Sequence, residues 1–536
     1  MIRTRIARLR ERDTRKLVAV LLGGKMLGVL GALALIKGVG WYFGSSAGAA
    51  VPGQAAATKA TDLINPINTM WVLIAAFLVF FMQAGFMALE AGFARSRETV
   101  NVLLECIFDT CLCGILYWAI GFAFQFGAGN GLIGSQYFFL GGAPATYGTT
   151  GVAFLAFWLF QLAFADAAST ITSGAMVGRT SFKGDILYSI TVSGFIYPIF
   201  GHWVWGPGGW LGNMTPGFLN SFTNGAVFRD FAGSTVVHTV GGMIALAGAI
   251  ALGPRIGRKF KRDGGGPMPA HDLTIGALGG ILLWFGWYGF NPGSTLSALD
   301  FQGIGRVATN TTLAASAAGL VAVAFVYPRS KTWDIGMSVN GFLGGLVAIT
   351  APVYWVSPTG AVLIGAIAGV VVPLGVDLLE YLRIDDPIGA VTVHAFAGIW
   401  GTLSVGLFAT GQFGVPTPTG VDASTTVRGL FFGGGLSQLK AQFIGSLTAV
   451  VVVTGVALAV MYVINAGRLL RISADGELEG MDLHEHGTPA YHMEFGQGVS
   501  YTTPIGSSSI RGLDLPKSAE VDGHDERMQP AEPEKV

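Results

Sequence analysis

The sequence predicts an all-α polytopic membrane protein, and composition is the first reason. Its 536 residues are 51% hydrophobic and 12% charged, with a mean hydropathy of +0.56. Soluble domains carry about 25% charged residues, so this chain has too few for an aqueous surface. Its 80 glycines fit a tightly packed bundle, because small residues let helices approach closely in lipid. The formal net charge is zero, so we expect no nucleic-acid partner.

Eleven long apolar segments after residue 65 are the second reason. Each is close to the ~20 residues that a membrane-spanning helix requires. They cover residues 68–92, 101–126, 152–177, 184–205, 234–253, 273–290, 304–327, 335–351, 358–380, 388–410 and 441–465. We therefore expect eleven transmembrane helices in a lipid bilayer, forming one transmembrane domain over residues 65–465.

The distribution of basic residues is the third reason, and it sets the orientation. Lys and Arg follow every odd-numbered segment, beginning with Arg95 and Arg97 after the first. The intervening loops carry few, and the main exceptions are Arg229, Arg428 and Lys440. Because basic loops stay in the cytoplasm, the odd-numbered segments end there. We expect a protein of the cell membrane with its mature N-terminus outside and its C-terminus in the cytoplasm.

The segments divide into two sets of five plus one C-terminal helix. Five is odd, so the second set runs inverted relative to the first, as in transporters built from inverted repeats. His238 lies in the last segment of the first set, eight residues after Asp230, and His394 lies in the last of the second set, eight after Asp386. If each Asp begins a helix, eight residues rise about 12 Å. Both imidazoles then lie near the bilayer midplane, where an ionisable group indicates function.

The two histidines leave more than one role open. Neutral imidazole accepts a proton and passes one on near neutral pH, so two adjacent rings would form a proton relay or a polar line through an apolar pore. Alternatively, they are unrelated histidines, each hydrogen-bonded within the bundle. No third ligand from Cys, Asp or Glu follows the spacing of a metal site, so we expect no metal and no cofactor.

The aspartates and aromatic residues near the expected outer face are also ambiguous. Asp230 and Asp386 suit helix N-caps, and Asp230 is in addition a candidate for attracting a cation. The motif HWVWGPGGW (202–210) fits either an interfacial aromatic belt or a cation–π site.

The two ends of the chain differ from the domain between them. Residues 1–50 combine a basic start, an apolar stretch interrupted by Lys25 and the small residues Ala47-Gly48-Ala49. This pattern predicts a signal peptide, with an uncleaved signal anchor as the alternative. Residues 466–536 predict a cytoplasmic tail, disordered beyond about residue 495 because it is rich in Asp, Glu, Pro and Gly. Its length leaves no room for a signalling output domain.

Seven motifs follow one another in a specific order and spacing between residues 65 and 492. They are MQAGFMALEAGFARSRETVNVL (82–103), FQLAFADAASTITSGAMVGR (160–179), YPIFGHWVWGPGGWLG (197–212), DFAGSTVVHTVGGMIALAGA (230–249), GWYGFNPGS (286–294), DDPIGAVTVHAFAGIWG (385–401) and GMDLHEHGTPAY (480–491). In these motifs the chain resembles the Amt/Mep/Rh ammonium transporters, and it is most similar to the Amt branch that includes plant-type members.

The resemblance implies an Amt-type fold, no enzymatic activity and a homotrimer with one pore in each protomer. It also assigns roles by motif position. These are a pore-lining pair (His238, His394), a stacked phenyl gate (Phe164, Phe290), an outer recruitment site for ammonium (Trp205, Ser294, Phe160), and a structural aspartate with a candidate role in deprotonation (Asp230). Without the resemblance, the three phenylalanines are interpreted as core residues or as residues of the interfacial aromatic belt.

The resemblance also concerns the cytoplasmic side. The tail motif of the family contacts neighbouring protomers, and many bacterial members are blocked by a PII-type protein such as GlnK, so this face is a candidate docking surface. One departure lies three positions after Asp386, where some bacterial members carry a second acidic residue and this chain has Gly389. That glycine weakens a mechanism that requires a carboxylate at the inner exit.

The expected function is therefore transmembrane transport of ammonium. An outer aromatic site would recruit NH4+, which loses a proton, and NH3 would pass the histidines into the cytoplasm with or without the separated proton. The alternatives are an ammonium sensor acting through the tail and an Rh-like channel for NH3 or CO2. Trp205 and Ser294 favour an Amt-type transporter over an Rh-like channel because these residues suit recruitment of a cation.

Overall fold

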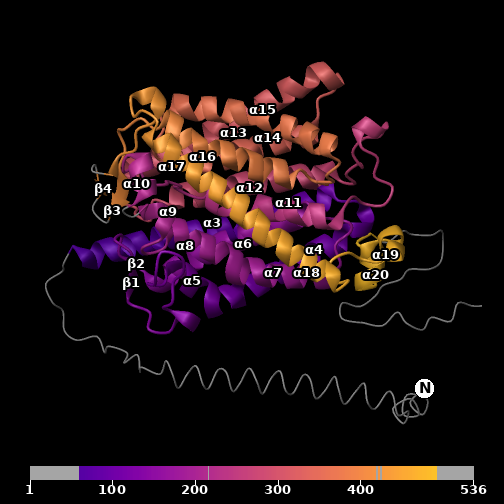
Figure 1. Cartoon of the computed structure of the whole chain (residues 1–536), viewed down its shortest axis with the longest axis horizontal. Coiled ribbons are helices and arrows are strands. Elements are labelled where there is room, and N and C mark those ends of the chain that lie inside the picture. The colour runs from indigo at the N-terminus through magenta and orange to yellow at the C-terminus, as the bar shows by residue number, and fades with distance from the viewer. Residues whose placement is uncertain (1–59, 215–216, 418–419, 423–424, 492–536) are drawn as a thin grey trace, which may run out of the picture.

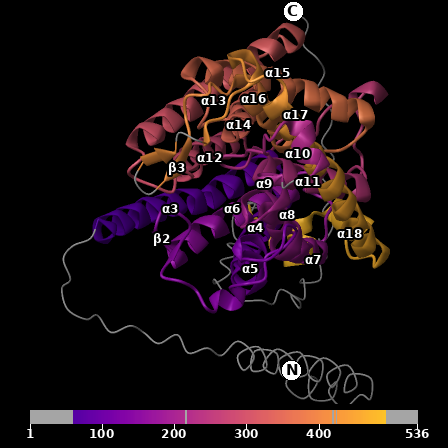
Figure 2. The same cartoon turned by 60° about the vertical axis from the view of Figure 1, so that its left-hand side comes forward.

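The chain forms a bundle of long helices whose axes run in one general direction (Figure 1). The computed structural model describes residues 60–214, 217–417, 420–422 and 425–491. The expected signal segment 1–50 and the tail beyond residue 495 lie outside this part of the chain. Helices α4 to α8 gather on one side of the bundle and α12 to α16 on the other, as the two views in Figures 1 and 2 agree.

Nine helical stretches in the described part are long and apolar enough to cross a membrane. They are Thr61–Phe93 (α3), Ser96–Phe126 (η1, α4, η2 and α5), Phe154–Gly174 (α6), Ser234–Leu252 (η5 and α11), Leu273–Gly293 (α12), Phe301–Ser330 (α13), Pro358–Leu382 (α15), Val391–Phe408 (η7 and α16) and Ser437–Ala466 (α17, η10 and α18). Each coincides with one of the predicted apolar segments. The all-α polytopic fold is thereby confirmed.

The two remaining predicted segments are helical as well. Residues 182–205 form α7 (Phe182–Thr191), a π-turn η4 (Val192–Ile196) and α8 (Tyr197–Trp205) without a break. Helix α14 (Ile335–Thr350) has 16 residues and is buried from Gly341 onward. It rises only about 24 Å, which is less than the ~30 Å of a bilayer core. The total of eleven spans stays a prediction.

Short elements fill the connections. At the outer end β1 (Thr146–Tyr147) pairs with β2 (Val152–Ala153), and β3 (Val415–Thr417) pairs with β4 (Gly420–Asp422), both antiparallel. The others are η3 (Phe138–Leu140), α9 (Trp210–Asn213), α10 (Phe218–Thr223), η6 (Lys261–Asp263), η9 (Leu430–Phe432), α19 (Ala474–Glu479) and α20 (Met481–His486).

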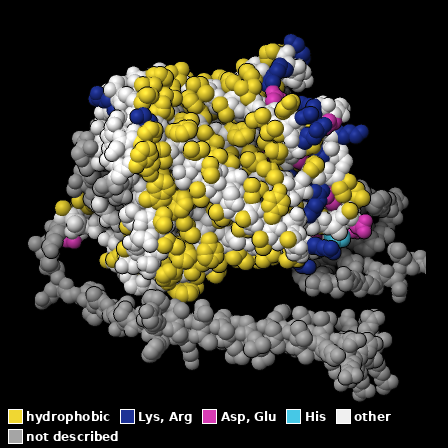
Figure 3. All heavy atoms as spheres, viewed as in Figure 1, with side chains coloured by type: hydrophobic (Ala, Val, Ile, Leu, Met, Phe, Trp, Pro, Cys, Tyr) yellow, Lys and Arg dark blue, Asp and Glu magenta, His cyan; other side chains and the backbone are white. Residues whose placement is uncertain are grey.

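The surface agrees with the predicted orientation. Figure 3 shows a broad band of hydrophobic side chains around the middle of the bundle, and Lys and Arg side chains gathered at the end where α19 and α20 lie. This end carries the basic loops that follow the odd-numbered segments. By the positive-inside rule this end is predicted to be the cytoplasmic one.

The two halves of the bundle interlock in a reciprocal way. In the loop before η5, the amides of Phe231 and Ala232 donate to the carbonyls of Ala351 and Thr350 at the end of α14, each over 3.2 Å. In the loop before η7, Ile388 packs so closely on the end of α6 that a Cβ added at Gly174 would lie 2.8 Å from its Cδ1. Each half thus receives the loop that precedes the histidine-bearing helix of the other half.

The start of the histidine-bearing helices corrects one expectation. The helix was expected to begin at Asp230, but residues 230–233 are not helical, and Gly233 has a φ of +120°. The π-helical turn η5 (Ser234–Thr239) begins after them, and η7 (Val391–Phe396) likewise begins after Gly389, which has a φ of +85°. The 12 Å rise from aspartate to histidine is therefore wrong, because the first residues of each stretch belong to an extended loop.

Candidate functional site

The two histidines meet at the centre of the bundle, each from the first turn of its helix. The Nδ1 atoms of His238 and His394 lie 3.2 Å apart, and the ring centroids are 5.3 Å apart. A hydrogen bond at this contact requires a proton on one Nδ1 and a lone pair on the other. The outward Nε2 atoms then have opposite characters, one an acceptor and one a donor. The Nε2 of His238 is buried and has no hydrogen-bond partner among the described residues.

An indole ring that the sequence did not single out fixes the orientation of His238. Trp287 stacks on the imidazole with centroids 5.0 Å apart and planes at 19°, and its Nε1 donates to the Thr350 hydroxyl over 2.9 Å. A signal was present in GWYGFNPGS, where Trp287 precedes Phe290 by three residues. Residues at this spacing share one face of a helix.

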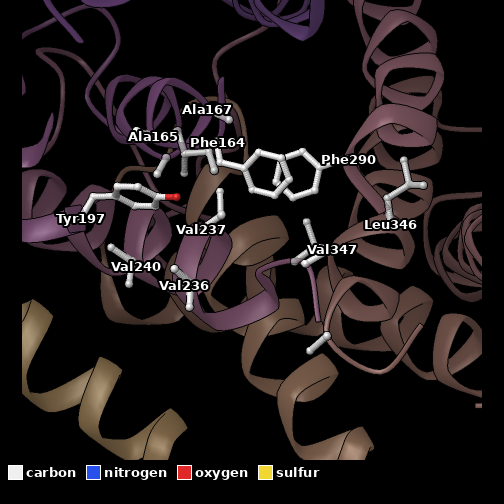
Figure 4. Packing of buried hydrophobic residues seen from close by; sticks show 14 of the residues in the cluster. Phe164, Ala165, Ala167, Tyr197, Val236, Val237, Val240, Phe290, Leu346 and Val347 are labelled. Atoms are coloured by element: carbon white, nitrogen blue, oxygen red, sulfur yellow. The ribbon is translucent and has the colours of Figure 1, made fainter. Parts of the chain in front are cut away.

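Two phenyl rings cover the histidine pair on the outer side. Phe164 of α6 and Phe290 of α12 stack with centroids 4.0 Å apart and planes at 19°. Figure 4 shows the two rings face to face, with Val237 and Val347 beside them. Phe290 also stacks on His238 at 5.4 Å. Both rings are at most 1% exposed, so they are buried.

An outer cavity of about 370 Å³ lies above the phenyl pair. It is lined by Trp205, Ser294, Phe160, Phe164 and Asp230, together with other residues. The indole Nε1 of Trp205 donates to the Asp230 carbonyl, and the hydroxyl of Ser294 donates to the Phe290 carbonyl, both over 2.8 Å. Since both protons are engaged, the indole face and the hydroxyl lone pairs are what these residues offer to a ligand. Both groups attract a cation.

The other aromatic residues of the 202–210 motif do not line this cavity. Trp203 donates from Nε1 to the carbonyl of Leu132 at the exposed outer edge and packs on Trp210 at 5.9 Å. Of the two interpretations of this motif, the cavity geometry thus favours a cation site for Trp205 alone, and an interfacial position for Trp203.

The aspartates occupy capping positions in both halves. Asp230 accepts hydrogen bonds from the amides of Gly233, Thr235 and Val236 over 2.8–2.9 Å, and Asp386 accepts from those of Ala390 and Val391. Burial raises the pKa of each carboxyl to about 6, although these amide bonds oppose the rise. Asp230 alone borders the outer cavity, and Asp386 lies on the inner side of the bundle.

A second cavity lies on the inner side of the histidine pair. Its volume is about 20 Å³, and His394, Gly389 and Glu90 are among its lining residues. A space of this size holds about one water molecule. Glu90 was missed at the sequence level, although a carboxyl group inside the apolar segment 68–92 is itself a signal, because charged groups are rare in membrane spans.

No group of three or more His, Cys, Asp or Glu residues in the described part of the chain is arranged to hold a metal ion. The central features of the bundle are an outer cavity, a phenyl pair, a histidine pair and an inner cavity, which follow one another along one line of contacts. A polytopic helical bundle with such a line through its centre belongs to the class of membrane transport proteins rather than to an enzyme class.

The comparisons with known proteins give the particular family. The sequence model of the Ammonium Transporter Family matches residues 70–491. The chain belongs to the ammonium transporter family, and it functions in ammonium transport.

Individual relatives agree with this assignment. The ammonium transporter Amt2 of Archaeoglobus fulgidus is 40% identical over 428 residues, which cover 80% of this chain and 88% of the relative. Ammonium transporter 1 member 3 of Solanum lycopersicum is 38% identical over 442 residues, covering 80% and 94%. Among solved structures, a Sensor Amt Protein is 35% identical with a TM-score of 0.70, covering 79% of this chain and 99% of the other. Saccharomyces cerevisiae Mep2 is 26% identical with a TM-score of 0.67, covering 79% and 91%.

Proposed function

We propose that this transporter recruits NH4+ in the outer cavity, removes a proton there and conducts NH3 past His238 and His394 into the cytoplasm. The observation that carries the proposal is the direct contact of the two imidazoles beneath the stacked phenyl rings. This arrangement offers polar nitrogen atoms in a section that is otherwise apolar and closed.

Contacts in the outer cavity would offset part of the free-energy cost of removing water from the cation. Moving an ammonium ion into an apolar space is costly. The indole face of Trp205, the ring of Phe160, the hydroxyl lone pairs of Ser294 and the carboxyl of Asp230 would offset part of that cost. A neutral ammonia molecule then passes when Phe164 and Phe290 separate, whereas a potassium ion has no proton to lose and stays outside.

The histidine pair would serve both the ammonia and the proton. The unpartnered Nε2 of His238 can exchange a hydrogen bond with an arriving ammonia. A proton that enters at the acceptor Nε2 of one ring, crosses the Nδ1–Nδ1 contact and leaves from the Nε2 of the other ring reverses the characters of the two outward nitrogens. We infer net movement of charge, in line with the similarity to plant-type members.

We place the protein in the cell membrane as a homotrimer, with the tail in the cytoplasm, where a PII-type regulator such as GlnK would dock. The extensive exposed apolar surface of α3, including Ile67, Met70, Ile74 and Phe77, supports burial against lipid or neighbouring protomers. The basic residues at the tail end support the orientation.

A second candidate function is ammonium sensing through the tail. One similar solved structure is named Sensor Amt Protein, and the tail of this chain contacts the bundle through α19 and α20. A sensor would bind ammonium at the same outer cavity and change the tail contacts without moving ammonium across the membrane.

One experiment separates the two candidates. The purified protein is reconstituted in proteoliposomes, and ammonium pulses are applied on a solid-supported membrane while a dye inside matched vesicles follows ammonia flux. A transporter gives ammonia flux with a transient current that potassium does not evoke. Ammonium binding without current or flux would exclude transport and favour the sensor.

The same assay tests the role of His238. His238→Ala should lower the ammonium flux about tenfold or let potassium produce a current, since a positioned acid–base group contributes about 100-fold or more to proton transfer. His271→Ala, the same change at the cytoplasmic surface, is the control. Size-exclusion chromatography checks that the trimer persists, and wild-type behaviour of His238→Ala would remove the imidazole from the mechanism.

A further inference from the structure

The inner cavity contains a carboxyl group from an unexpected helix. Glu90, on α3, borders the same space of about 20 Å³ as His394, and its side chain is almost fully buried. His394 is 7% exposed, compared with 1% for His238, so His394 is the member of the pair that opens to this cavity. A space of this volume holds about one water molecule, so there is room for water between the residues that line it.

Glu90 is held in place by a hydroxyl and not by a basic side chain. The Ser173 hydroxyl on α6 donates to its Oε2 over 3.0 Å. The charged groups that act on it from the neighbouring helices are Asp185 on α7 and Asp109 on α4, both acidic. No ion pair of Glu90 with Lys, Arg or His occurs in the described ranges. A buried carboxylate without a counter-charge is costly, so such a group favours states in which it holds a proton.

Polar side chains continue from Glu90 along one face of α6. Ser173 is followed, one turn away, by Thr170, whose hydroxyl lies 3.3 Å from Asp109 Oδ2 and 3.1 Å from Gln83 Oε1. The hydroxyl of Ser169 donates to Asp109 Oδ1 over 2.7 Å. The Ser173 hydroxyl also lies 2.8 Å from the backbone carbonyl of Thr170, so Glu90 stands beside this polar group and is not an isolated acid.

The loop before η7 leaves room for this carboxyl. Gly389 stands at the position where some bacterial members of the family carry an acidic residue, and it borders the same cavity as Glu90. A Cβ at Gly389 would lie 2.6 Å from Asn340 Nδ2, and the φ of +85° disfavours side chains there. The inner exit therefore does have a carboxyl group, contributed by α3 in place of the loop.

We propose that Glu90 is the proton acceptor on the inner side of the histidine pair, an inference that rests on the proposed pore function. A protonated imidazole at His394 gives its Nε2 proton through one water to the Glu90 carboxylate, which becomes the neutral acid. The carboxylic acid then gives this proton to an arriving ammonia or to water, and an ammonium or hydronium ion leaves towards the cytoplasm. The N–H bond that breaks at His394 and the O–H bond that forms at Glu90 balance, and the carboxylate is regenerated.

The test compares Glu90→Gln with Glu105→Gln in proteoliposomes, measuring both the charge moved and the ammonia flux. Glu105 is a buried carboxyl on α4 that accepts from Asn101 over 2.8 Å and does not border the inner cavity. Glutamine keeps the shape of the side chain but cannot take up a proton. The charge moved per ammonia should fall about tenfold or more in Glu90→Gln, stay at the wild-type value in Glu105→Gln, and be partly retained in Glu90→Asp.

A purely structural role would lower charge and flux together and leave their ratio unchanged, and that result would overturn the inference. If Glu90→Gln does not assemble, Ser173→Ala is the deciding variant, because it removes the hydrogen bond to Oε2 of Glu90. It should also lower the charge moved per ammonia. An unchanged charge per ammonia in this variant overturns the inference. If the unmutated protein conducts ammonia without moving any charge, the role of Glu90 is overturned while the proposed pore stays intact. Absence of both flux and charge would instead refute the proposed pore function.

Discussion

At the scale of single residues, Trp205 and Ser294 in the outer cavity present electrons and not protons to a ligand. Trp205 and Ser294 both donate their hydrogens to backbone carbonyls of the protein. Asp230 adds a carboxyl whose oxygens accept three backbone amides. These three side chains favour a small cation over an anion, whereas the basic side chain of Arg229, which also lines the cavity, opposes one. The contribution of Asp230 depends on its charge.

Under the proposed function, Asp230 should make recruitment of ammonium dependent on pH. Burial raises the pKa of this carboxyl to about 6. The group is therefore charged above that pH and neutral below it, so ammonium binding should weaken as pH falls through about 6. The ammonium concentration for half-maximal current should rise about tenfold if the lost attraction is about 1.4 kcal/mol. The measurement is the current as a function of ammonium concentration between pH 5 and pH 8.

Asp230→Asn is the matched variant, because it removes the charge and keeps one acceptor oxygen for the cap. It should show weak recruitment at every pH, without the rise below pH 6. If the variant keeps the pH profile of the wild type, a group other than Asp230 causes the dependence.

At the scale of helices, the histidines owe their contact to glycine crossings between η7 and α11 (Val240–Leu252). A Cβ at Gly242 would lie 2.4 Å from the backbone nitrogen of Ala395, one residue after His394. On the other side of the crossing, a Cβ at Gly398 would lie 2.5 Å from the carbonyl oxygen of Ser234. Backbone atoms cannot move aside as a flexible side chain can, so these glycines set the separation of the two helices.

Gly242→Ala should push the helices apart and weaken the His238–His394 contact. Overpacking of this kind costs about 1–3 kcal/mol, so we expect a lower melting temperature together with lower ammonia flux. Scanning fluorimetry in detergent and the vesicle assay measure the two effects.

Gly114→Ala is the control for this change. It lies within α4 (Thr99–Leu116), and a Cβ there would meet no atom within 4 Å. Alanine in place of glycine inside a helix gains about 1 kcal/mol of helix propensity, so this variant should be as stable as the wild type or more stable. Equal melting temperatures for Gly242→Ala and the wild type would show that the crossing is not tight.

At the scale of the whole molecule, the tail is bound to the end of the bundle at which the basic side chains gather. Asp482 accepts a hydrogen bond from the amide of Asn101 over 2.9 Å, and Arg97 donates to the carbonyl of Leu478 over 2.7 Å. His486 Nε2 lies 2.9 Å from the side-chain oxygen of Asn101. These contacts join α20 to the turn between α3 and α4, and α3 carries Glu90 at the inner cavity.

Deletion of residues 480–492 should therefore reduce ammonium flux or abolish binding of a PII-type protein. The physical reason is that the α3–α4 turn loses its contacts with Asp482 and His486. Flux in vesicles and pull-down of purified GlnK measure the two effects. Deletion of residues 510–522, a segment of equal length outside the motif, is the control. If neither flux nor GlnK binding changes, the tail motif has no regulatory role.

Local properties of the chain predicted much of the architecture. The predicted segments 68–92 and 358–380 correspond to the helices Thr61–Phe93 and Pro358–Leu382. They could be predicted because hydropathy along a helix depends only on neighbouring residues. The orientation, which rests on the basic loops, stays a prediction. The start of η5 at residue 234 agrees with the predicted segment 234–253. The helical rise assumed from Asp230 to His238 was wrong, since the loop at 230–233 is held by Ala351 and Thr350, which lie more than a hundred residues away in the sequence.

The sequence by itself determined the class of the protein, the course of its helices and the matched Asp–His pairs, because apolar length, charge and spacing are properties of contiguous residues. Only the tertiary structure decided that Nδ1 of His238 contacts Nδ1 of His394, that Trp287 stacks on His238 and that Glu90 borders the inner cavity. Each of these contacts joins helices from distant parts of the chain. Their positions depend on glycine crossings and π-turns, which hydrophobic periodicity does not encode.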